Sequence, residues 1–551
     1  MSGWMQGNSS RARSANGSAS LLASVAARAS SLACKKLRSR NPVFLCLLCL
    51  LWPFIPACSK RETATAAPAE KILRISQRNE PATLDPQLAT LPDEFFIIRA
   101  LGEGLLTPNP DGGTPLAGVA ETWEVSADGL IYTFHLRGNA KWSNGDAVTA
   151  QDFVRSIERA LNHTAAAPKA ALFFAVRGAW ERYTGIVDVP VVFGASAPDT
   201  RTLVLNLTHP VADFPATVAS GPWIPVPSAG NITNGPFTLV EWKPNQHIAV
   251  RKNPYYWDAA NVKLDGIRFL AFDSGDTEER AFRAGQLDVT MSVPFSKLVP
   301  YRTAQPKIIR SVPLYETRYL ALNVGRPPLN DLRVRRALAL AIDRAALVEK
   351  VILSGRPAFN FVPAGLGGYQ PAASIKEDAV EARRLLAEAG FPEGRGFPKL
   401  ELAAWPVSSA QLEAIQQMWR RELGIEITIA QREARTHLTS LAGGDFTLAL
   451  ATAIPDYDGA SDLFTQLTAN HPLNYPHWRD AEFDRLVDAA GRLTDPAARN
   501  ASYQQAEARL LAEIPVIPLY FNAQNFLVSP RVKDWKADRL WTRFYRQVSV
   551  E

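Results

Sequence analysis

The sequence predicts an α/β protein with more than one domain. In some segments apolar and polar residues alternate, as in a half-buried strand. In the segments between them apolar residues recur every three or four positions, as in an amphipathic helix. The chain has 551 residues, enough for several packed domains. From about residue 324 to residue 521 the alternation is regular and indicates a domain of its own.

The first half of the chain is predicted to be rich in strands. Residues 73–77 form a first strand, and residues 122–136 form a hairpin because two alternating runs flank Asp128-Gly129. A helix is expected to follow Thr149, which suits an N-cap, with Asp152 in its first turn, where an acid is favourable. The remaining predictions are a strand at 202–207, a proline-rich loop at 210–227 and a hairpin of residues 237–242 and 248–251.

The second half is predicted to alternate between helices and strands. A helix follows Asp331, because Val334, Leu338 and Ile342 fall on one helical face. Further helices are expected at residues 376–389, 409–423, 480–493 and 497–513, and strands at 400–403, 426–429 and 447–451. A last strand at 519–528 has a position from which the chain can return to the first domain.

The N-terminus has the layout of an export signal. A basic stretch at residues 35–40 precedes a short apolar run that ends in Ile55-Pro56-Ala57-Cys58. The run is shorter than the roughly 20 residues that a membrane span needs. Its end resembles a bacterial lipobox, so residues 1–57 are predicted to be a leader with a lipoprotein signal peptide, with Cys58 as the lipidated residue and residues 58–70 as a flexible tether. The alternative is an uncleaved anchor in which the cysteine is incidental.

Charge and cysteine content exclude several classes of protein. The formal charge of +6 could suggest a nucleic-acid-binding protein, but residues 1–57 hold seven basic residues and no acidic one. The rest of the chain carries 53 basic and 54 acidic residues, so no nucleic-acid partner is expected. All four cysteines fall in the first 58 residues, which excludes disulfides, cysteine nucleophiles and thiolate metal sites after them.

Catalytic motifs are missing from the sequence. It contains no G-x-S-x-G elbow, no P-loop and no G-x-G-x-x-G after a strand. The seven histidines are scattered, and the nearest pair, His471 and His477, lacks the spacing of a helical zinc site. We therefore expect a protein that is not an enzyme and that needs neither a metal nor a cofactor.

Six sequence blocks occur in an order typical of one family. They are residues 133–145 with 148–153 (TFHLRGNAKWSNG and VTAQDF), 234–237 (NGPF), 253–258 (NPYYWD), 330–338 (NDLRVRRAL), 382–391 (ARRLLAEAGF) and 514–520 (IPVIPLY). Together they resemble the extracellular solute-binding proteins of peptide and nickel ABC transporters, family 5, and most of all its periplasmic oligopeptide-binding members. The resemblance runs from about residue 72 to residue 528.

Several residues of these blocks also have a purely structural interpretation. Trp142, Tyr256 and Trp257 are expected to pack in the core or at a hinge, and Gly145 and Gly235 to serve turns. The basic cluster of Arg333, Arg335 and Arg336 is expected to be a solvated helix face with ion pairs.

The resemblance implies a two-lobed periplasmic-binding-protein fold (type II, Venus-flytrap) with an extra α/β domain inserted in the first lobe. On this expectation lobe I comprises residues 71–102, 223–323 and 522–551, the extra domain residues 103–222, and lobe II residues 324–521. A ligand would be trapped as the lobes close about a hinge.

The resemblance also implies how a peptide would bind. An extended peptide can pair its backbone with exposed strand edges, which gives broad specificity, whereas a buried α-ammonium needs a carboxylate partner. Asp456 falls at the family's acidic position and is predicted to hold the ammonium; Asp458 and Asp462 are close enough to be confused with it, and a turn-capping role is the alternative. The backbone groups expected to pair with the peptide belong to Ala453, Ile454 and Leu91, and Tyr520 would line the cleft.

Some positions depart from the family's pattern. A tryptophan often precedes the acidic loop, where this chain has Ala453. Basic groups expected to meet the peptide's carboxylate correspond to Leu441 and Leu450, and Arg435 and His437 could take their place. The length and side-chain preference of the peptide therefore stay open.

The expected function is that of a lipid-anchored solute-binding subunit of an ABC importer. It would capture oligopeptides and deliver them to a membrane permease driven by ATPase subunits. The protein would be a monomer, held by its lipid on the periplasmic side of the cell envelope. One alternative keeps the fold but binds a metal chelate, haem, sugar or cell-wall peptide; the other is a surface sensor or chaperone that is not coupled to transport.

Overall fold

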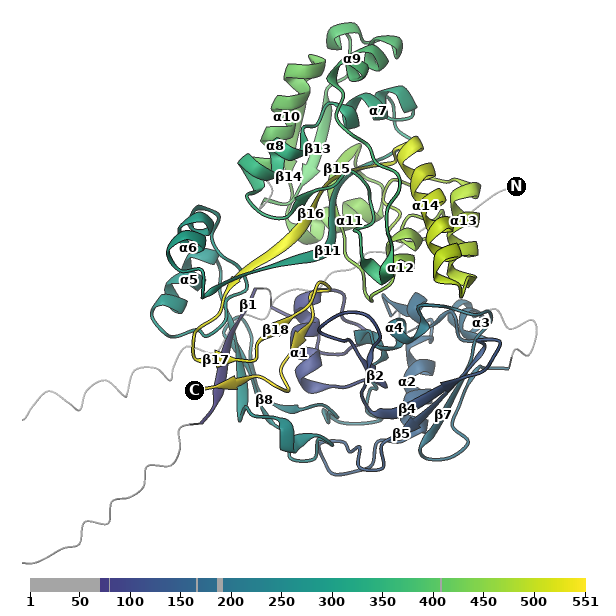
Figure 1. The fold of residues 1–551 in the computed structure, drawn as a ribbon, viewed down its shortest axis with the longest axis vertical. Helices are drawn as coiled ribbons and strands as arrows, with labels where there is room; N and C mark the ends of the chain where they lie inside the picture. The colour runs from purple at the N-terminus through teal and green to yellow at the C-terminus, as the bar shows by residue number, and fades with distance from the viewer. Residues whose placement is uncertain (1–69, 79, 165–166, 186–191, 407–408) are drawn as a thin grey trace, which may run out of the picture. The chain divides into compact units, whose positions relative to one another are not determined.

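The computed structural model describes residues 70–78, 80–164, 167–185, 192–406 and 409–551 (Figure 1). The predicted leader, the lipidation residue Cys58 and the tether up to residue 69 lie outside the described residues. No helix within the described ranges combines the length and apolarity that a membrane crossing requires. The described chain is built on one six-stranded and two four-stranded sheets, each of which is the core of one part of the fold.

The sheet of lobe I joins the beginning of the described chain to its middle. Its strand order is β1-β10-β9-β8, with β1 (Ile72–Gln77), β8 (Phe237–Lys243), β9 (His247–Lys252) and β10 (Gly266–Ala271). β1 runs parallel to β10, and β8 and β9 form the predicted hairpin. The core under this sheet combines Leu73 and Ile97 with Phe526 and Val550, so the C-terminal segment packs against lobe I.

The sheet of the inserted domain, here called the third domain, has the order β4-β5-β7-β6. Its strands are β4 (Ala120–Val125), β5 (Ile131–Leu136), β6 (Ala195–Ser196) and β7 (Thr202–Asn206), and α2 (Ala150–Ala160) packs against them. The predicted hairpin at Asp128-Gly129 is confirmed, with Gly129 at a φ of 72°. The predicted start of α2 is also confirmed, because the Thr149 N–H and hydroxyl donate to the Asp152 carboxylate at 2.8 and 2.9 Å.

The prediction of an irregular proline-rich loop at residues 210–227 is wrong. The segment contains α4 (Phe214–Val218) and the 3-10 helix η2 (Gly221–Trp223). Pro215 and Pro222 stand in the first turns of these helices, where a backbone N–H has no partner inside the helix and proline is therefore tolerated. Burial of Phe214 and Trp223 in the third domain's core stabilises both short helices.

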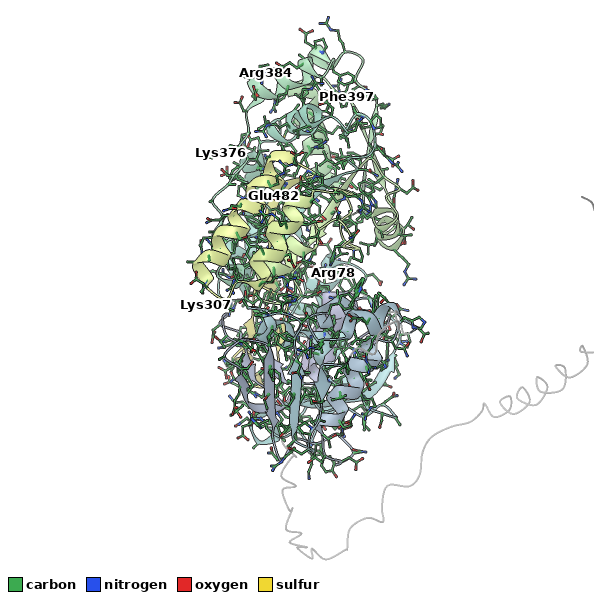
Figure 2. The ribbon with its side chains drawn as sticks, turned by 90° about the vertical axis from the view of Figure 1, so that its right-hand side faces the viewer. Arg78, Lys307, Lys376, Arg384, Phe397 and Glu482 are labelled. Atoms are coloured by element: carbon green, nitrogen blue, oxygen red, sulfur yellow. The ribbon has the colours of Figure 1, made fainter. Side chains whose placement is uncertain are left out.

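Lobe II is built on the six-stranded sheet β12-β16-β11-β15-β13-β14. Its strands are β11 (Ile309–Leu322), β12 (Arg356–Pro357), β13 (Leu400–Ala404), β14 (Ile427–Gln431), β15 (Leu448–Ala453) and β16 (Val516–Leu527). Five predicted helices are confirmed as α7 (Leu332–Leu340), α9 (Ala379–Glu388), α10 (Ser409–Leu423), α13 (Ala481–Arg492) and α14 (Pro496–Glu513). Figures 1 and 2 show α13 and α14 side by side, with Glu482 at the surface of α13.

Two long strands join lobe II to lobe I. β11 and β16 pair from Ala321 and Val516 at one end to Ile309 and Leu527 at the other, with a register shift between Pro313 and Thr317 (Figure 1). Val528 then bridges to Val289, which in turn bridges to Ile75 of β1. The strand predicted at residues 519–528 therefore does return to the first domain, and it begins earlier, at Val516.

The shorter elements complete the description. The helices are α1 (Pro92–Leu101), η1 (Ala170–Phe173), α3 (Ala179–Thr184), η3 (Ala259–Asn261), α5 (Gly275–Arg283), η4 (Phe295–Lys297), α6 (Leu298–Ala304), α8 (Arg344–Ala346), η5 (Leu347–Ile352), η6 (Leu366–Gly368), η7 (Pro392–Gly394), α11 (Ala434–Ala442) and α12 (Ala460–Thr465). The short strands are β2 (Leu106–Thr107), β3 (Leu116–Ala117), β17 (Val532–Lys533), β18 (Lys536–Ala537), β19 (Arg543–Phe544) and β20 (Ser549–Val550).

The expectation of a solvated arginine cluster on α7 needs a correction. Arg333 is exposed and pairs with Asp331, as expected. Arg335 is only 5% exposed and donates to the carbonyls of Glu513, at 2.7 and 3.0 Å, and Leu329, at 3.0 Å. These carbonyls satisfy the guanidinium, so Arg335 can be buried where α7 meets the end of α14.

Candidate functional site

Three cavities lie in a row between the lobes. The outer cavity has a volume of 740 Å³ and is bordered by lobe I, the third domain and lobe II. The central cavity has only 40 Å³ and shares Asp456 with the outer one. The hinge cavity has 500 Å³, lies beside β16 and shares Trp541 with the central one. Together they form a cleft of the kind in which small molecules bind between domains.

Asp456 lies in the loop that follows β15 and faces this cleft. Its carboxylate forms an ion pair with the ammonium of Lys169, which immediately precedes η1 in the third domain. The side chains are 29% and 17% exposed, so the pair is partly shielded from solvent. The ring of Phe95 lies 5.2 Å from the lysine nitrogen and adds a cation–π contact. The pair therefore connects the third domain to lobe II across the cleft.

Three neighbouring carboxylates are engaged in other bonds. Asp462 accepts the backbone N–H of Asp456 at 2.8 Å, and its removal from bulk solvent, together with the charge of Asp456, raises its pKa to about 8. Asp458 accepts the N–H groups of Gly367 at 2.8 Å and Gly113 at 3.3 Å. Asp213 accepts the Ser461 hydroxyl at 2.7 Å. No group of three or more His, Cys, Asp or Glu side chains in the described ranges is placed to hold a metal ion.

The predicted peptide-pairing segment lies at the end of β15. Ala453 is the last residue of β15 and is aligned with Thr317 of β11 on one side. On the other side the pairing of β15 with β13 ends at Ala449, so the edge from Leu450 onward is not part of that ladder. Ile454 borders the central cavity, and its carbonyl accepts a bond from Gln466 at 3.3 Å. The structure thus brings Ile454 and Asp456 together at an open strand end.

Leu91 and Tyr520 occupy different positions along the cleft. Leu91 is the N-cap of α1, its N–H donates to the Glu94 carboxylate at 2.9 Å, and the next residue, Pro92, borders the central cavity. Tyr520 borders the hinge cavity and donates its hydroxyl to Gln411 at 2.9 Å. Burial raises the pKa of Tyr520 to about 12, so the hydroxyl stays protonated. Ala453 and Leu91 themselves border none of the three cavities.

The basic groups near the cleft differ from those suggested by the sequence. His437 is 1% exposed and bonds the Leu450 carbonyl at 2.8 Å, and Arg435 is exposed on α11. Arg78 and Arg318 border the hinge cavity instead. Arg318 lies in β11, and only the polar alternation of that strand could have indicated it. Nothing in the sequence indicates Lys169, which lies 287 residues from Asp456.

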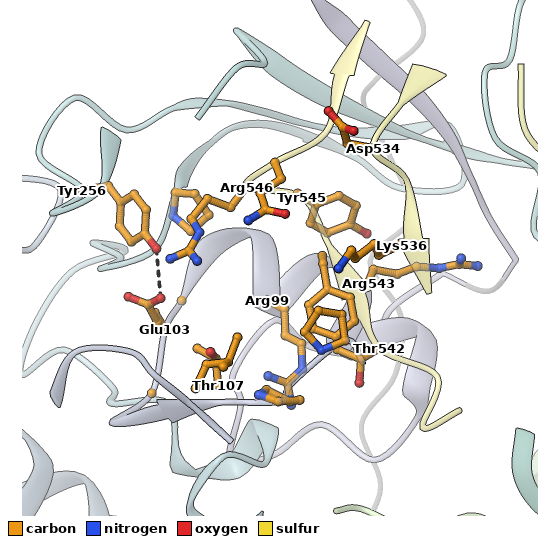
Figure 3. A pocket seen from close by; sticks show the side chains of 18 residues that line it. Arg99, Glu103, Thr107, Tyr256, Asp534, Lys536, Thr542, Arg543, Tyr545 and Arg546 are labelled. Atoms are coloured by element: carbon orange, nitrogen blue, oxygen red, sulfur yellow. Dashed lines mark hydrogen bonds between the residues drawn. The ribbon is translucent and has the colours of Figure 1, made fainter. Parts of the chain in front are cut away.

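A separate cavity of 120 Å³ lies between lobe I and the first residues of the third domain (Figure 3). Glu103, 7% exposed, accepts the Tyr256 hydroxyl at 2.9 Å and the Trp257 indole N–H at 2.5 Å. Burial raises the pKa of Glu103 to about 7 despite these bonds. Tyr256 and Trp142 are buried, which confirms the packing role predicted for them. The charged residues that line this cavity come from lobe I and from the first residues of the third domain, and none of them belongs to lobe II.

The comparisons with known proteins identify the family. A family model described as bacterial extracellular solute-binding proteins, family 5, middle, matches residues 114–474. The chain belongs to this family. It is 31% identical over 516 residues to the probable deoxycholate-binding periplasmic protein YgiS of Escherichia coli, which covers 90% of this chain and 96% of that protein. It is 32% identical over 496 residues to the periplasmic oligopeptide-binding protein OppA of E. coli, covering 85% and 90%.

Solved structures of family-5 proteins share the fold. The murein tripeptide-binding protein MppA of E. coli superimposes with a TM-score of 0.81 at 30% identity, covering 88% of this chain and 99% of that one. The unliganded open form of MppA gives a lower TM-score of 0.70 at the same identity, covering 88% and 98%. The predicted two-lobed fold is confirmed, and this chain superimposes less closely on the open form of MppA.

Proposed function

We propose that this family-5 protein is the solute-binding subunit of an ABC importer and captures short peptides between its lobes. The observation that carries the proposal is the position of Asp456, which faces the cleft from the open end of β15. A carboxylate beside an unpaired strand edge can recognise an ammonium and a peptide backbone together. Support also comes from relatives whose names state oligopeptide binding.

In this proposal the peptide extends the sheet of lobe II. Backbone groups of Ala453 and Ile454 pair with the peptide on one side of the cleft, and the backbone at Leu91 faces it from lobe I. Asp456 holds the α-ammonium, and Tyr520 borders the space that later residues of the ligand fill. Because backbone pairing ignores side chains, the protein would accept many sequences.

The proposal extends to the cell envelope. A lipid on Cys58 would hold the protein to the membrane on the periplasmic side, and the tether to residue 70 would let it reach the permease. The chain would act as a monomer, with domain boundaries near residues 102, 222, 323 and 521. The last two lie just after β11 and within β16, the two strands that join lobe II to lobe I. Permease and ATPase subunits would supply the transport step.

A second candidate ligand is an amphipathic carboxylate. The relative YgiS is named as a probable deoxycholate-binding protein, and deoxycholate has a carboxylate and no amine. Arg78 and Arg318 border the 500 Å³ hinge cavity, which offers positive charge to such a group.

Native mass spectrometry of residues 59–551, purified from cells without refolding, tests the proposal. Co-purifying masses that fragment as short peptides support it, and a single non-peptide mass supports the second candidate. Calorimetry with those peptides then compares Lys169→Met with Lys169→Met/Asp456→Asn, because Lys169 otherwise pairs with the Asp456 carboxylate. The second change keeps the size of the side chain but removes its charge, and we expect it to weaken binding by about tenfold or more, because a buried ammonium loses its partner. Equal affinities of these two variants would remove Asp456 from the binding site.

A further inference from the structure

The ion pair between Lys169 and Asp456 places a cation of the chain itself where a ligand's ammonium would bind. Lys169 belongs to the third domain and Asp456 to lobe II, so the contact exists only while the two approach each other. The central cavity beside the pair has a volume of 40 Å³, which is space for a few water molecules only. A peptide's terminal residue therefore does not fit in the central cavity while Lys169 is in place, and from the outer cavity it meets an Asp456 carboxylate that is already paired.

The loop of Asp456 accommodates one cation rather than two. Burial and the charge of Asp456 raise the pKa of Asp462, and Asp456 is the carboxylate that pairs with Lys169. A second ammonium beside Lys169 would meet an unbalanced positive charge in a partly shielded space. Among the described residues that line the central cavity, Asp456 is the one acidic residue, whereas Lys169 and Arg99 are both cationic.

We infer that Lys169 is a specificity-determining residue that competes with a ligand's ammonium for Asp456. This inference rests on the proposed function of the cleft. A peptide with a free amino terminus must displace Lys169 from Asp456. The ion pair between the peptide's ammonium and Asp456 then replaces the ion pair between Lys169 and Asp456. A ligand without an amine leaves the pair intact and extends into the outer or the hinge cavity. The chain therefore accepts N-blocked peptides and amine-free carboxylates as readily as free peptides.

The test compares trialanine with N-acetyl-trialanine by calorimetry. For the wild type we expect dissociation constants within about threefold of each other, because the exchange of partners is nearly neutral. In Lys169→Met the free peptide should bind better than the acetylated one by about tenfold or more, since the Asp456 carboxylate is then released from its ion pair. Lys169→Arg keeps the charge and should behave like the wild type.

Lys297→Met is the matched control. It removes another partly buried lysine, which pairs with Glu279 at 2.5 Å within lobe I, and should leave the ratio unchanged. If peptides bind but Lys169→Met keeps the wild-type ratio, the inference is overturned while the proposed function stands. A free-peptide preference of tenfold in the wild type overturns it as well.

If neither peptide binds any variant, the proposed capture of peptides is overturned. A measurement without ligand then still tests the contact between Lys169 and Asp456. Residues 59–551 contain no cysteine, so spin labels can be placed at Ala127→Cys in the third domain and Ala387→Cys on α9. Lys169→Met and Asp456→Asn should each shift the label distances toward longer values. The double variant should add no further shift, because both changes remove the same contact. Additive shifts, or none, would overturn the role of Lys169.

Discussion

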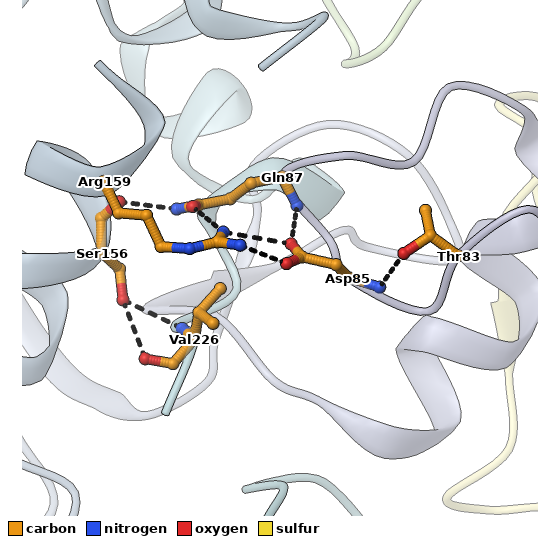
Figure 4. Close-up of polar contacts among 6 residues, drawn as sticks. All are labelled: Thr83, Asp85, Gln87, Ser156, Arg159 and Val226. Carbon is orange, nitrogen blue, oxygen red and sulfur yellow. Dashed lines mark hydrogen bonds and ion pairs between the residues drawn. The ribbon is translucent and has the colours of Figure 1, made fainter. Parts of the chain in front are cut away.

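Arg159 of α2 and Asp85 of the segment after β1 form an ion pair that fastens the third domain to lobe I (Figure 4). The guanidinium also donates to Gln87 at 2.6 Å, and Gln87 returns a bond of 2.6 Å to the Ser156 carbonyl. The Ser156 hydroxyl accepts the N–H of Val226 at 2.9 Å. One turn of α2 thus binds the two chain segments that lead into and out of the third domain.

Replacing Arg159 by methionine should destabilise the protein by about 1 to 3 kcal/mol, because partly buried bonds to a charged group are lost. Urea unfolding followed by circular dichroism measures the change. Arg384→Met, which removes an exposed pair with Glu381 on α9 (Figure 2), is the control and should shift the free energy of unfolding by about 0.5 kcal/mol or less. Equal effects of the two changes would mean that the Arg159 contacts contribute no more than a surface pair.

Glu507 of α14 organises the loop after β12. Its carboxylate accepts the N–H groups of Phe361 and Val362, both at 2.9 Å, and the Tyr369 hydroxyl at 2.6 Å. The side chain is fully buried, and this burial raises its pKa. Glu507→Ala should cost about 3 kcal/mol or more, because it leaves three buried donors unpaired. Glu507→Gln keeps an acceptor and should cost clearly less in the same unfolding experiment; a reversed order would contradict this account.

Local sequence patterns predicted the regular elements well and the polar contacts poorly. The hairpin at Gly129 and the capping box of Thr149 and Asp152 are recognisable because their partners lie within a few residues. The sequence pattern does not predict α4, because prolines are typical of loops and only the burial of Phe214 in the core explains why a helix forms here. Arg335 was misjudged for a related reason, since its carbonyl partners come from other elements.

At the candidate site, too, local patterns and family motifs indicated single residues but not the contacts between distant ones. Asp456 could be named from the order of family motifs, and Tyr520 from its place in the last block. Lys169 could not, because no local pattern relates it to a carboxylate in another part of the fold. Contacts that form only when two lobes approach depend on the tertiary arrangement, which the sequence pattern does not contain.

The raised pKa of Asp462 should appear in the pH dependence of stability. Its pKa is raised to about 8 in the folded protein, from 3.8 for an unperturbed aspartate, so between these values the folded state binds more protons than the unfolded state. Stability should therefore fall as pH rises through this range, by up to about 1.4 kcal/mol per pH unit from this group. Asp462→Asn removes this titrating group. In urea unfolding between about pH 5 and 8, the free energy of unfolding of the variant should therefore depend less on pH than that of the wild type. An unchanged slope would mean that Asp462 is already ionised.

Arg318 is the group placed to meet a ligand's carboxylate in the hinge cavity. It pairs with Glu316 at 2.6 Å, but Glu316 also accepts Asn522 at 3.0 Å and Trp541 at 2.8 Å, so its charge is shared among three partners. Because the guanidinium has five donors, it can bind a second carboxylate without leaving Glu316. Arg318→Met should weaken a free peptide more than its C-terminal amide, by about tenfold in the ratio of dissociation constants. Arg432→Met, which removes a pair with Glu401 within lobe II, should not change that ratio. If the amide and the free acid lose affinity equally in Arg318→Met, the arginine supports the packing of the cavity and the ligand's carboxylate binds elsewhere.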